Sequence, residues 1–221
     1  MIDTLLSIVA PHHCCGCGKS GGLLCPNCKY NIISETKNVC LACGRPSFNP
    51  GVCNTCKVPY GRAWFVGERK DVLQRLVGLY KFERVKSAYN DLASLLDNVL
   101  PQLPDSTVIV PIPTVPAHIR ERGYDHTLLL ARRLGRIRKL PVARILVRNT
   151  NTMQRHATAA TRGLQAKIAF KVAGTVDENI NYLIVDDVVT TGATVRYAAK
   201  ALKDAGATQI WVAVLARQTL D

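Results

Sequence analysis

The sequence lacks any long apolar run, and it has no cysteine beyond residue 56. None of its apolar stretches approaches the roughly 20 residues that a transmembrane helix needs, so we expect no membrane span. Residues 1–10 carry no basic segment and only a short apolar part, so we interpret them as part of the fold rather than as a signal peptide. With 221 residues, the chain has room for one α/β domain and a small appendage, and we expect it in the cytoplasm.

Acidic residues are scarce in one window of the chain. Residues 117–172 hold thirteen Lys and Arg against two Asp and Glu, which gives a net charge of +11 out of +13 for the whole chain. A concentrated basic field attracts phosphate groups, either of a small ligand or of a nucleic acid. A merely solvated face is the alternative, but this ratio is lopsided for a device that only maintains solubility.

All nine cysteines lie within residues 14–56, and eight of them form four Cys-x-x-Cys pairs. Two such pairs complete a tetrahedral set of thiolates around one zinc ion. A disulfide framework would need an oxidising compartment and an export signal, so the sequence favours zinc. We expect two structural Zn²⁺ sites. Their expected ligands are Cys14, Cys17, Cys25, Cys28, Cys40, Cys43, Cys53 and Cys56.

The spacing leaves the pairing of these cysteines open. Two sequential groups, within 14–28 and 40–56, are the simplest arrangement, and the spacing also permits an interleaved cross-brace. Cys15 is left over, either as a free thiol or as a competitor of Cys14 for the metal. Gly18 and Gly44 each follow a second cysteine directly, which suits a zinc knuckle, where positive φ is common.

Prolines and glycines between residues 44 and 62 mark the end of the cysteine-rich part. We therefore divide the chain into a double zinc-ribbon domain, 1–62, and an α/β domain, 63–221. Helices and strands alternate in the second domain, which indicates a mostly parallel sheet with helices on both faces. Hydrophobic periodicity predicts helices at 71–80, 87–100, 125–139 and 194–205, and strands at 107–112, 181–185 and 210–216. On the 125–139 helix, Leu130, Leu134 and Ile137 are expected to share the buried face.

The segment 182–194 leads from a buried strand through Asp186 and Asp187 into a Thr-Thr-Gly-Ala-Thr turn and a helix. The glycine lets the backbone approach a ligand closely, and N–H groups at a helix N-terminus point at an anion. Adjacent carboxylates at the end of a strand bind vicinal sugar hydroxyls, directly or through Mg²⁺. Taken alone, the turn could be a capped helix start and the carboxylates a solvated turn. Together they predict a sugar-phosphate site.

This segment resembles the signature of type I phosphoribosyltransferases that binds 5-phosphoribosyl diphosphate (PRPP). The resemblance implies that Asp186 and Asp187 are catalytic and hold the ribose hydroxyls, with Mg²⁺ bound alongside PRPP. The residues implied to cradle the 5′-phosphate are Thr190, Thr191, Gly192, Ala193 and Thr194. The reaction would displace pyrophosphate from C1 of the ribose, helped by positioning and by positive charge around the leaving group. Thr190 stands where the enzymes for hypoxanthine and guanine have an acidic base, which disfavours that acceptor class.

Two further segments resemble the ComF (ComFC) family. Val-Pro-Ile-Pro at 110–113 with Arg-Glu-Arg-Gly-Tyr-Asp-His at 120–126 looks like one family segment, and residues 148–170 look like the mobile loop of that family. With the four Cys-x-x-Cys pairs, the resemblance covers nearly the whole chain and implies a type I phosphoribosyltransferase-like α/β fold. Asp125 and His126 depart from the usual Asn-Gln, near the expected pyrophosphate. The basic or pyrophosphate-side residues implied are Arg120, Arg122, Gly123, Arg148 and Arg162.

Three functions stay open at this point. The resemblance implies a PRPP-binding, phosphoribosyltransferase-like protein that acts in natural competence, in the uptake and cytoplasmic handling of single-stranded DNA. A second interpretation is a non-enzymatic adaptor for DNA or a helicase, with PRPP as a regulator. Few aromatic residues near the cysteines are available to stack bases, namely Tyr30, Phe48, Tyr60 and Trp64. The third is a salvage phosphoribosyltransferase for a small acceptor that the residues do not name.

Overall fold

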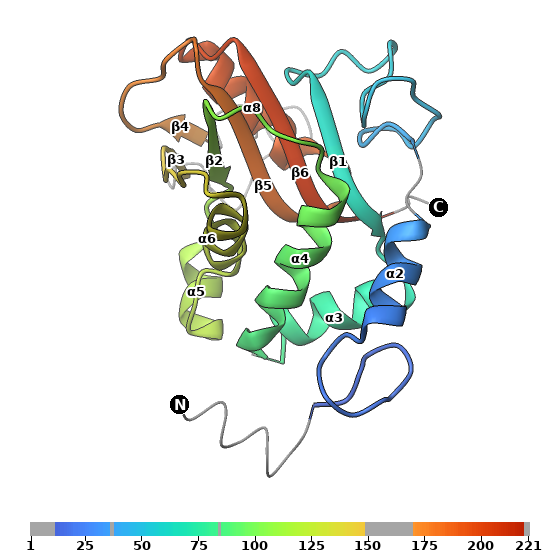
Figure 1. Cartoon of the computed structure of the whole chain (residues 1–221). Helices are drawn as coiled ribbons and strands as arrows, with labels where there is room; N and C mark the ends of the chain where they lie inside the picture. Colours follow the sequence, from blue (N-terminus) through green and yellow to red (C-terminus); the bar gives the residue numbers. More distant parts are fainter. Residues whose placement is uncertain (1–11, 36–37, 84, 149–169, 219–221) are drawn as a thin grey trace, which may run out of the picture.

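A parallel sheet forms the centre of the computed structural model, which describes residues 12–35, 38–83, 85–148 and 170–218. Its strands are β1 (Arg62–Glu68), β2 (Thr107–Pro111), β5 (Asn181–Val189) and β6 (Gln209–Arg217), in the spatial order β1-β6-β5-β2 (Figure 1). The pairs within this sheet are parallel. The central strands β5 and β6 are buried along almost their whole length, because helices cover both faces of the sheet.

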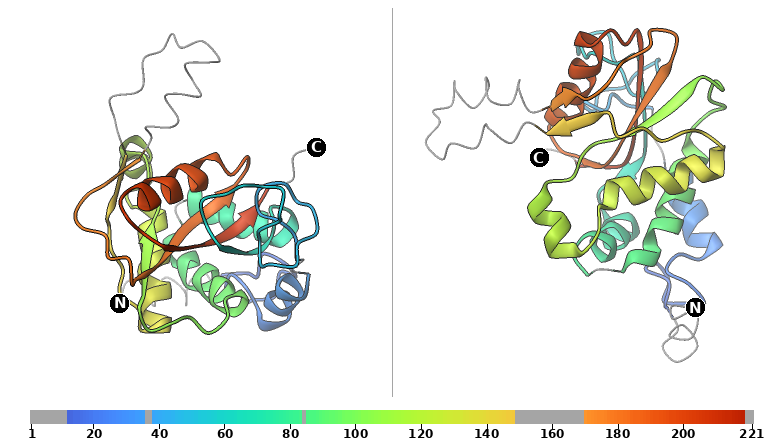
Figure 2. Two further views of the ribbon diagram at one scale, coloured as in Figure 1. Left: turned by 90° about the horizontal axis from the view of Figure 1, so that it is seen from above. Right: turned by 90° about the vertical axis from the view of Figure 1, so that its left-hand side faces the viewer.

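Helices lie on the two faces of this sheet (Figure 2). One face carries α3 (Asp71–Lys81), α4 (Tyr89–Val99) and α6 (His126–Arg138), and the other carries α8 (Ala193–Asp204). The 3-10 turn η1 (Lys86–Ala88) leads into α4, and α5 (Pro116–Arg122) follows β2. The expected α/β fold with a mostly parallel sheet is confirmed. Among the described residues, no helix is both long and apolar enough to cross a membrane.

The expected helices and strands match observed elements, with shifted ends. The strand expected at 181–185 continues to Val189, because its backbone pairs with β6 as far as Arg217. The sequence patterns missed β1, α2 (Pro26–Ser34), α5, and the antiparallel ribbon of β3 (Leu146–Arg148) and β4 (Phe170–Val172). Short elements give too few residues for a periodicity, and α2 buries none of its residues, so it has no apolar face to reveal it.

Helix α6 differs from the expectation at its end. Leu130 and Leu134 are buried, but the expectation for Ile137 is wrong, since this side chain is 36% exposed. The neighbouring Arg138 turns toward α4 instead. Its Nη2 donates hydrogen bonds to the carbonyl oxygens of Asp97 and Leu100, at 2.5 and 2.9 Å. A cation at the negative end of the α4 dipole thus joins the two helices.

The two cysteine-rich loops lie apart on the molecule. The first lies next to α3 at the bottom of Figure 1, and the second lies beside β1 at the upper right. Leu23 of the first loop belongs to the core shared with α3 and α4, whereas Leu41 of the second belongs to the core shared with α8. Each loop therefore packs into the α/β part, and the domain boundary at residue 62 stays a prediction.

Candidate functional site

The turn between β5 and α8 presents a helix N-terminus. Thr190, Thr191 and Thr194 are exposed, and Gly192, with φ +72°, is the N-cap of α8. Residues other than glycine are strained at such a φ. The Thr191 hydroxyl accepts a hydrogen bond from Ala193 N–H at 3.4 Å. Because the first N–H groups of a helix have no partner within the helix, this turn is suited to bind an anion.

Asp186 and Asp187 lie near the end of β5, and both are buried. Successive side chains of a strand point to opposite faces. Asp187 accordingly reaches α3 and α6, whereas Asp186 lies on the α8 side, where its charge interacts with that of Arg148 on β3. The two predicted catalytic carboxylates therefore have different surroundings, although they are adjacent in the sequence.

The carboxylate of Asp187 is the centre of a buried polar network. Its Oδ2 lies 2.8 Å from Nζ of Lys81, the last residue of α3, and 2.5 Å from Nε2 of His126, the first residue of α6. Its Oδ1 accepts a hydrogen bond from Val188 N–H at 2.5 Å. Because the side chains of Asp187 and His126 are only 6% and 8% exposed, water hardly screens this contact. One carboxylate thus ties two helices to the strand that carries the turn.

The hydrogen bonds around His126 define its tautomer. Its Nδ1 lies 3.0 Å from Nη1 of Arg122, and a guanidinium can only donate, so the proton of the ring sits on Nε2 and faces Asp187. Thr114 lies 3.3 Å from the same Nδ1 and donates to Asp125 at 2.8 Å. Asp125 also caps α6, accepting a hydrogen bond from the N–H two residues after His126 at 3.1 Å. Asp125 and His126, the two residues that depart from the family pattern, are therefore both held by hydrogen bonds within the protein.

The two aspartates differ in proton affinity. Burial, and next the adjacent charge of Asp187, raise the pKa of Asp186 well above the usual range of an aspartate. Burial alone would also raise the pKa of Asp187, but the hydrogen bond from His126 and the positive charge of Lys81 outweigh burial and lower this pKa. Asp187 is consequently the carboxylate that the protein holds ionised.

Two of the predicted basic residues lie close to these aspartates. Arg122 reaches Asp187 through His126, and its guanidinium also lies 5.7 Å from the centre of the exposed Phe82 ring. Arg148 donates from Nε to the carbonyl oxygen of Pro113 at 2.7 Å, so it lies beside the loop that follows β2. A cavity of about 460 Å³ opens here between β2, α5 and β3. Its lining includes Thr114, Asp125, Arg144 and Arg148.

The remaining predicted residues of the basic, pyrophosphate-side set are Arg120, Gly123 and Arg162. Arg120 is exposed on α5, and Gly123 ends this helix with φ +82°. Arg162 lies outside the described residues. A larger cavity, of about 610 Å³, lies away from all of these, between α2, β1 and α3. The smaller cavity, with its two arginines, is the one that adjoins the predicted site.

Sequence reasoning missed Lys81 and the aromatic residues that support it. The hydroxyl of Tyr80 donates to the carbonyl oxygen of His126 at 2.7 Å, and the hydroxyl of Tyr124 donates to the carbonyl oxygen of Tyr80. Tyr80 is fully buried, so these bonds anchor the end of α3 against the start of α6. A lysine between two aromatic residues at a predicted helix end was the available signal, but periodicity of apolar residues says nothing about it.

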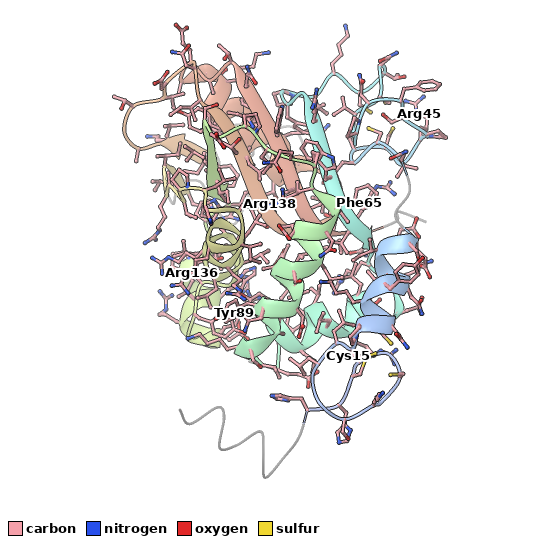
Figure 3. The ribbon with its side chains drawn as sticks, in the orientation of Figure 1. Cys15, Arg45, Phe65, Tyr89, Arg136 and Arg138 are labelled. Carbon is pink, nitrogen blue, oxygen red and sulfur yellow. The ribbon has the colours of Figure 1, made fainter. Side chains whose placement is uncertain are left out.

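The predicted metal ligands come together in two sequential groups. The sulfur atoms within each group lie within 4.8 Å of one another, so the pairing is not interleaved. The two groups lie apart on the molecule: in Figure 3, the label Cys15 marks the neighbourhood of the first group and the label Arg45 that of the second. The first group is Cys14, Cys17, Cys25 and Cys28, and the second is Cys40, Cys43, Cys53 and Cys56.

The spacing within each group fits a tetrahedral ion. The sulfurs of Cys17 and Cys25 are 3.7 Å apart, and so are those of Cys43 and Cys53. Zinc–sulfur bonds of about 2.3 Å place tetrahedral ligands about 3.8 Å apart, whereas a disulfide needs about 2.05 Å. The knuckle glycines at positions 18 and 44 both have φ +74°, as expected. The two groups could therefore each hold a zinc ion.

Arg45 and Cys15 lie next to the two four-cysteine groups. Arg45 donates from Nε to Cys43 Sγ at 3.5 Å and lowers the pKa of this thiol to about 6. Cys15 belongs to neither group. Burial, and next the charge of Cys14, raise the pKa of the Cys15 thiol. Cys15 is therefore set apart by its position outside both groups.

The arrangement of sheet, turn and helix matches a known class of proteins. Residues 128–219 match the family model described as the phosphoribosyl transferase domain. The fold is therefore that of a type I phosphoribosyltransferase, preceded by a cysteine-rich region with two four-cysteine groups. Among solved structures, the glutamine PRPP amidotransferase from B. subtilis is 22% identical with a TM-score of 0.41, over 57% of this chain and 25% of that chain.

Relatives with similar sequences show to which family of phosphoribosyltransferase-like proteins the chain belongs. Competence protein ComFC of Bacillus subtilis is 28% identical over 196 residues, which cover 83% of this chain and 79% of that protein. The DNA utilization protein YhgH of Salmonella typhimurium is 33% identical over 217 residues, which cover 88% of this chain and 90% of that protein. The chain belongs to the ComFC family.

Proposed function

We propose that this chain binds PRPP with Mg²⁺ at the turn between β5 and α8. The observation that carries the proposal is the combination, in one segment, of two buried aspartates and an exposed threonine-rich turn at a helix N-terminus. The N–H groups of Gly192 and Ala193 and the hydroxyls of Thr190, Thr191 and Thr194 would hold the 5′-phosphate.

Asp186 and Asp187 would hold the ribose hydroxyls. An ionised carboxylate offers about four acceptor positions. Lys81 and His126 lie against Oδ2 of Asp187, and the backbone N–H of Val188 donates to Oδ1, whose second position would receive a hydroxyl. Paired carboxylates beside phosphates also fit Mg²⁺, which prefers oxygen ligands and would neutralise charge on the diphosphate when bound.

The basic residues would receive the pyrophosphate. Arg122 and Arg148 adjoin the network and the cavity beside β2, and Arg120 and Arg162 would add charge from α5 and from the segment after β3. We propose transfer of the phosphoribosyl group to an acceptor other than hypoxanthine or guanine, because Thr190 cannot take a proton near neutral pH.

Calorimetric titration of the full chain with PRPP and Mg²⁺ tests the proposal. We expect binding by the parent chain and a loss of about 10- to 100-fold or more for Asp187→Ala, because hydrogen bonds to charged groups contribute about 1.5–3 kcal/mol. Asp187→Asn, which keeps the shape of the side chain, should also lose affinity. Asp204→Ala, at the far end of α8, should not, since this carboxylate is exposed and pairs with Lys200. Parent-like binding by Asp187→Ala would contradict the proposal.

We also propose a role in natural competence and in the cytoplasmic handling of single-stranded DNA. The names of the curated relatives and the net charge of +11 within residues 117–172 support it. Nine free cysteines suit a reducing compartment. Residues 1–62 would form the double zinc-ribbon domain with two structural Zn²⁺, and partners would include DNA and uptake proteins such as a helicase.

The structure leaves fewer aromatic residues for DNA than the sequence offers. Tyr30 and Phe48 are 72% and 108% exposed, whereas Tyr60 is buried and Trp64 packs edge-on against Trp211 at 5.6 Å. Tyr30 and Phe48 are therefore the two side chains near the cysteines that would stack on bases.

Fluorescence anisotropy with a labelled single-stranded oligonucleotide tests DNA binding. We expect the affinity to fall steeply between about 50 and 200 mM salt, because counterions are released from the phosphates. Phe48→Ala should weaken binding by about 1–3 kcal/mol if bases stack on this ring, and Tyr60→Phe should not change it. An affinity that is indifferent to salt would count against the DNA role.

A further inference from the structure

The second cysteine-rich loop lies next to the turn between β5 and α8. A Cβ atom on Gly192 would stand 3.8 Å from Cγ1 of Val189 and 4.0 Å from Cα of Ala42, which is ordinary van der Waals distance. Ala42 lies between Cys40 and Cys43, two ligands of the second four-cysteine group. The backbone of a knuckle that would be held by metal is therefore a neighbour of the proposed phosphate turn.

Arg217 is a second link between the same parts. It is the last residue of β6, pairs with Val189 at the end of β5, and is only 7% exposed. Its Nε donates to the carbonyl oxygen of Leu41 at 3.3 Å. Its guanidinium lies so close to Gly44 that a Cβ there would stand 2.9 Å from Cζ. The residue after it also donates from its N–H to the carbonyl oxygen of Val189 at 2.7 Å.

Charge favours this position of Arg217. A divalent ion with four thiolates carries about two net negative charges. The guanidinium lies against Gly44, which follows the ligand Cys43, and Arg45, the next residue, donates to the Cys43 sulfur. A buried cation beside a negative metal centre is paired rather than isolated, which makes its burial less costly.

The first cysteine-rich loop has a different neighbourhood. Its residues pack with α3 and α4, and Lys29 donates from Nζ to the Ser94 hydroxyl of α4 at 2.6 Å. Gly18 occupies the place in this knuckle that Gly44 has in the second, with the same φ of +74°. Within the described part of the chain, nothing lies within 4 Å of a Cβ built on Gly18.

We infer that the second four-cysteine group, acting through Leu41, Ala42 and Arg217, positions the turn that receives the PRPP phosphate, and that the first group does not. Arg217 is thus a positioning residue that no sequence pattern indicated. The inference rests on the proposed function for its ligand, but the contacts that carry it do not depend on PRPP.

The matched substitutions Gly44→Ala and Gly18→Ala test this inference. Both place a Cβ at the same left-handed φ, so both carry the same backbone strain of about 1–2 kcal/mol. Only Gly44→Ala also forces the buried guanidinium of Arg217 to move. In variants that each retain two zinc ions, we expect Gly44→Ala to weaken PRPP binding about tenfold or more, which corresponds to about 1.4 kcal/mol, and Gly18→Ala to leave it within twofold.

Hydrogen exchange of the backbone amides at residues 190–194 gives a readout that needs no PRPP. We expect faster exchange there in Gly44→Ala than in Gly18→Ala at equal global stability, because local opening follows local contacts. Equal exchange and equal affinity in the two variants would overturn the inference. If the parent does not bind PRPP, the proposed function fails, and the exchange comparison still decides the positioning role. Arg217→Met, which replaces no residue of either knuckle, should reproduce the effect of Gly44→Ala.

Discussion

Removal of zinc from this chain is expected to cause the largest loss of stability of any treatment. Structural zinc sites contribute on the order of 10 kcal/mol each, while a whole domain is stable by only about 5–15 kcal/mol. Apart from Leu23 and Leu41, these loops bury few large apolar side chains, since α2 buries none of its residues and each knuckle is closed by turns. Because Leu23 and Leu41 belong to the two cores, their loss would open both faces of the sheet.

A strong chelator under reducing conditions checks this expectation. We expect release of two zinc ions per chain, measured by mass spectrometry of the metal, and a fall of the thermal midpoint by about 20 °C or more, at about 2–4 °C per kcal/mol for a chain of this size. Added zinc should restore the midpoint. A metal-free chain with an unchanged midpoint would contradict the structural role of the metal.

Single substitutions separate ligand cysteines from the remaining one. Cys53→Ser should lose one zinc ion and much of the stability, because it removes a ligand of the second group. Cys15→Ser should keep both ions, because Cys15 belongs to neither group. Loss of zinc by Cys15→Ser would show that this thiol takes part in binding.

The fold was largely predictable because its strongest signals are local. The helices around Leu73, Leu92 and Leu130 bury one apolar face each, and such a face has a helical period in the sequence. Strand β1 was not predictable in the same way, because its identity depends on pairing with β6, more than 140 positions along the chain. The positions of the two cysteine-rich loops depend on similar distant contacts, such as that of Leu41 with Arg217.

The candidate site was predictable as a set of residues but not as a geometry. The Thr-Thr-Gly-Ala-Thr turn carries its own backbone chemistry, so its position at a helix N-terminus followed from the sequence. The side chains of Asp186 and Asp187 point to opposite faces of the sheet because side chains alternate along β5. Predicting these opposite directions required knowing that β5 continues beyond both residues. Lys81 and His126 are brought to Asp187 by helix packing, which no short motif records.

The substitution Lys81→Met is expected to destabilise the ligand-free chain by about 3–5 kcal/mol, because breaking a buried ion pair leaves an uncompensated charge. The side chains of Lys81 and Asp187 are 18% and 6% exposed, so solvent compensates little of the loss. Asp186 beside it adds a second buried carboxyl group. Chemical denaturation with zinc present measures the change.

Lys70→Met is the matched control for this substitution. Lys70 stands at the other end of α3, and its side chain, 54% exposed, lies 3.9 and 4.0 Å from the carboxylates of Glu35 and Glu68. Surface pairs of this kind contribute about 0–1 kcal/mol, so this variant should unfold almost like the parent. Equal losses in the two lysine variants would mean that the contact of Lys81 with Asp187 has no special role.

The pH dependence of the stability difference between Lys81→Met and the parent tests whether Asp187 is the partner of Lys81. In the parent, the pKa of Asp187 is lowered on folding, so its contribution is present above the unfolded value of about 4 and is lost as the pH falls through the lower folded value. Without Lys81, the pKa of Asp187 rises and this contribution shrinks. The deficit of Lys81→Met should therefore be largest near neutral pH. It should decrease below about pH 4, where Asp187 becomes protonated in the unfolded chain and the parent loses this contribution. A deficit independent of pH would assign the loss to the packing of the lysine side chain rather than to its charge.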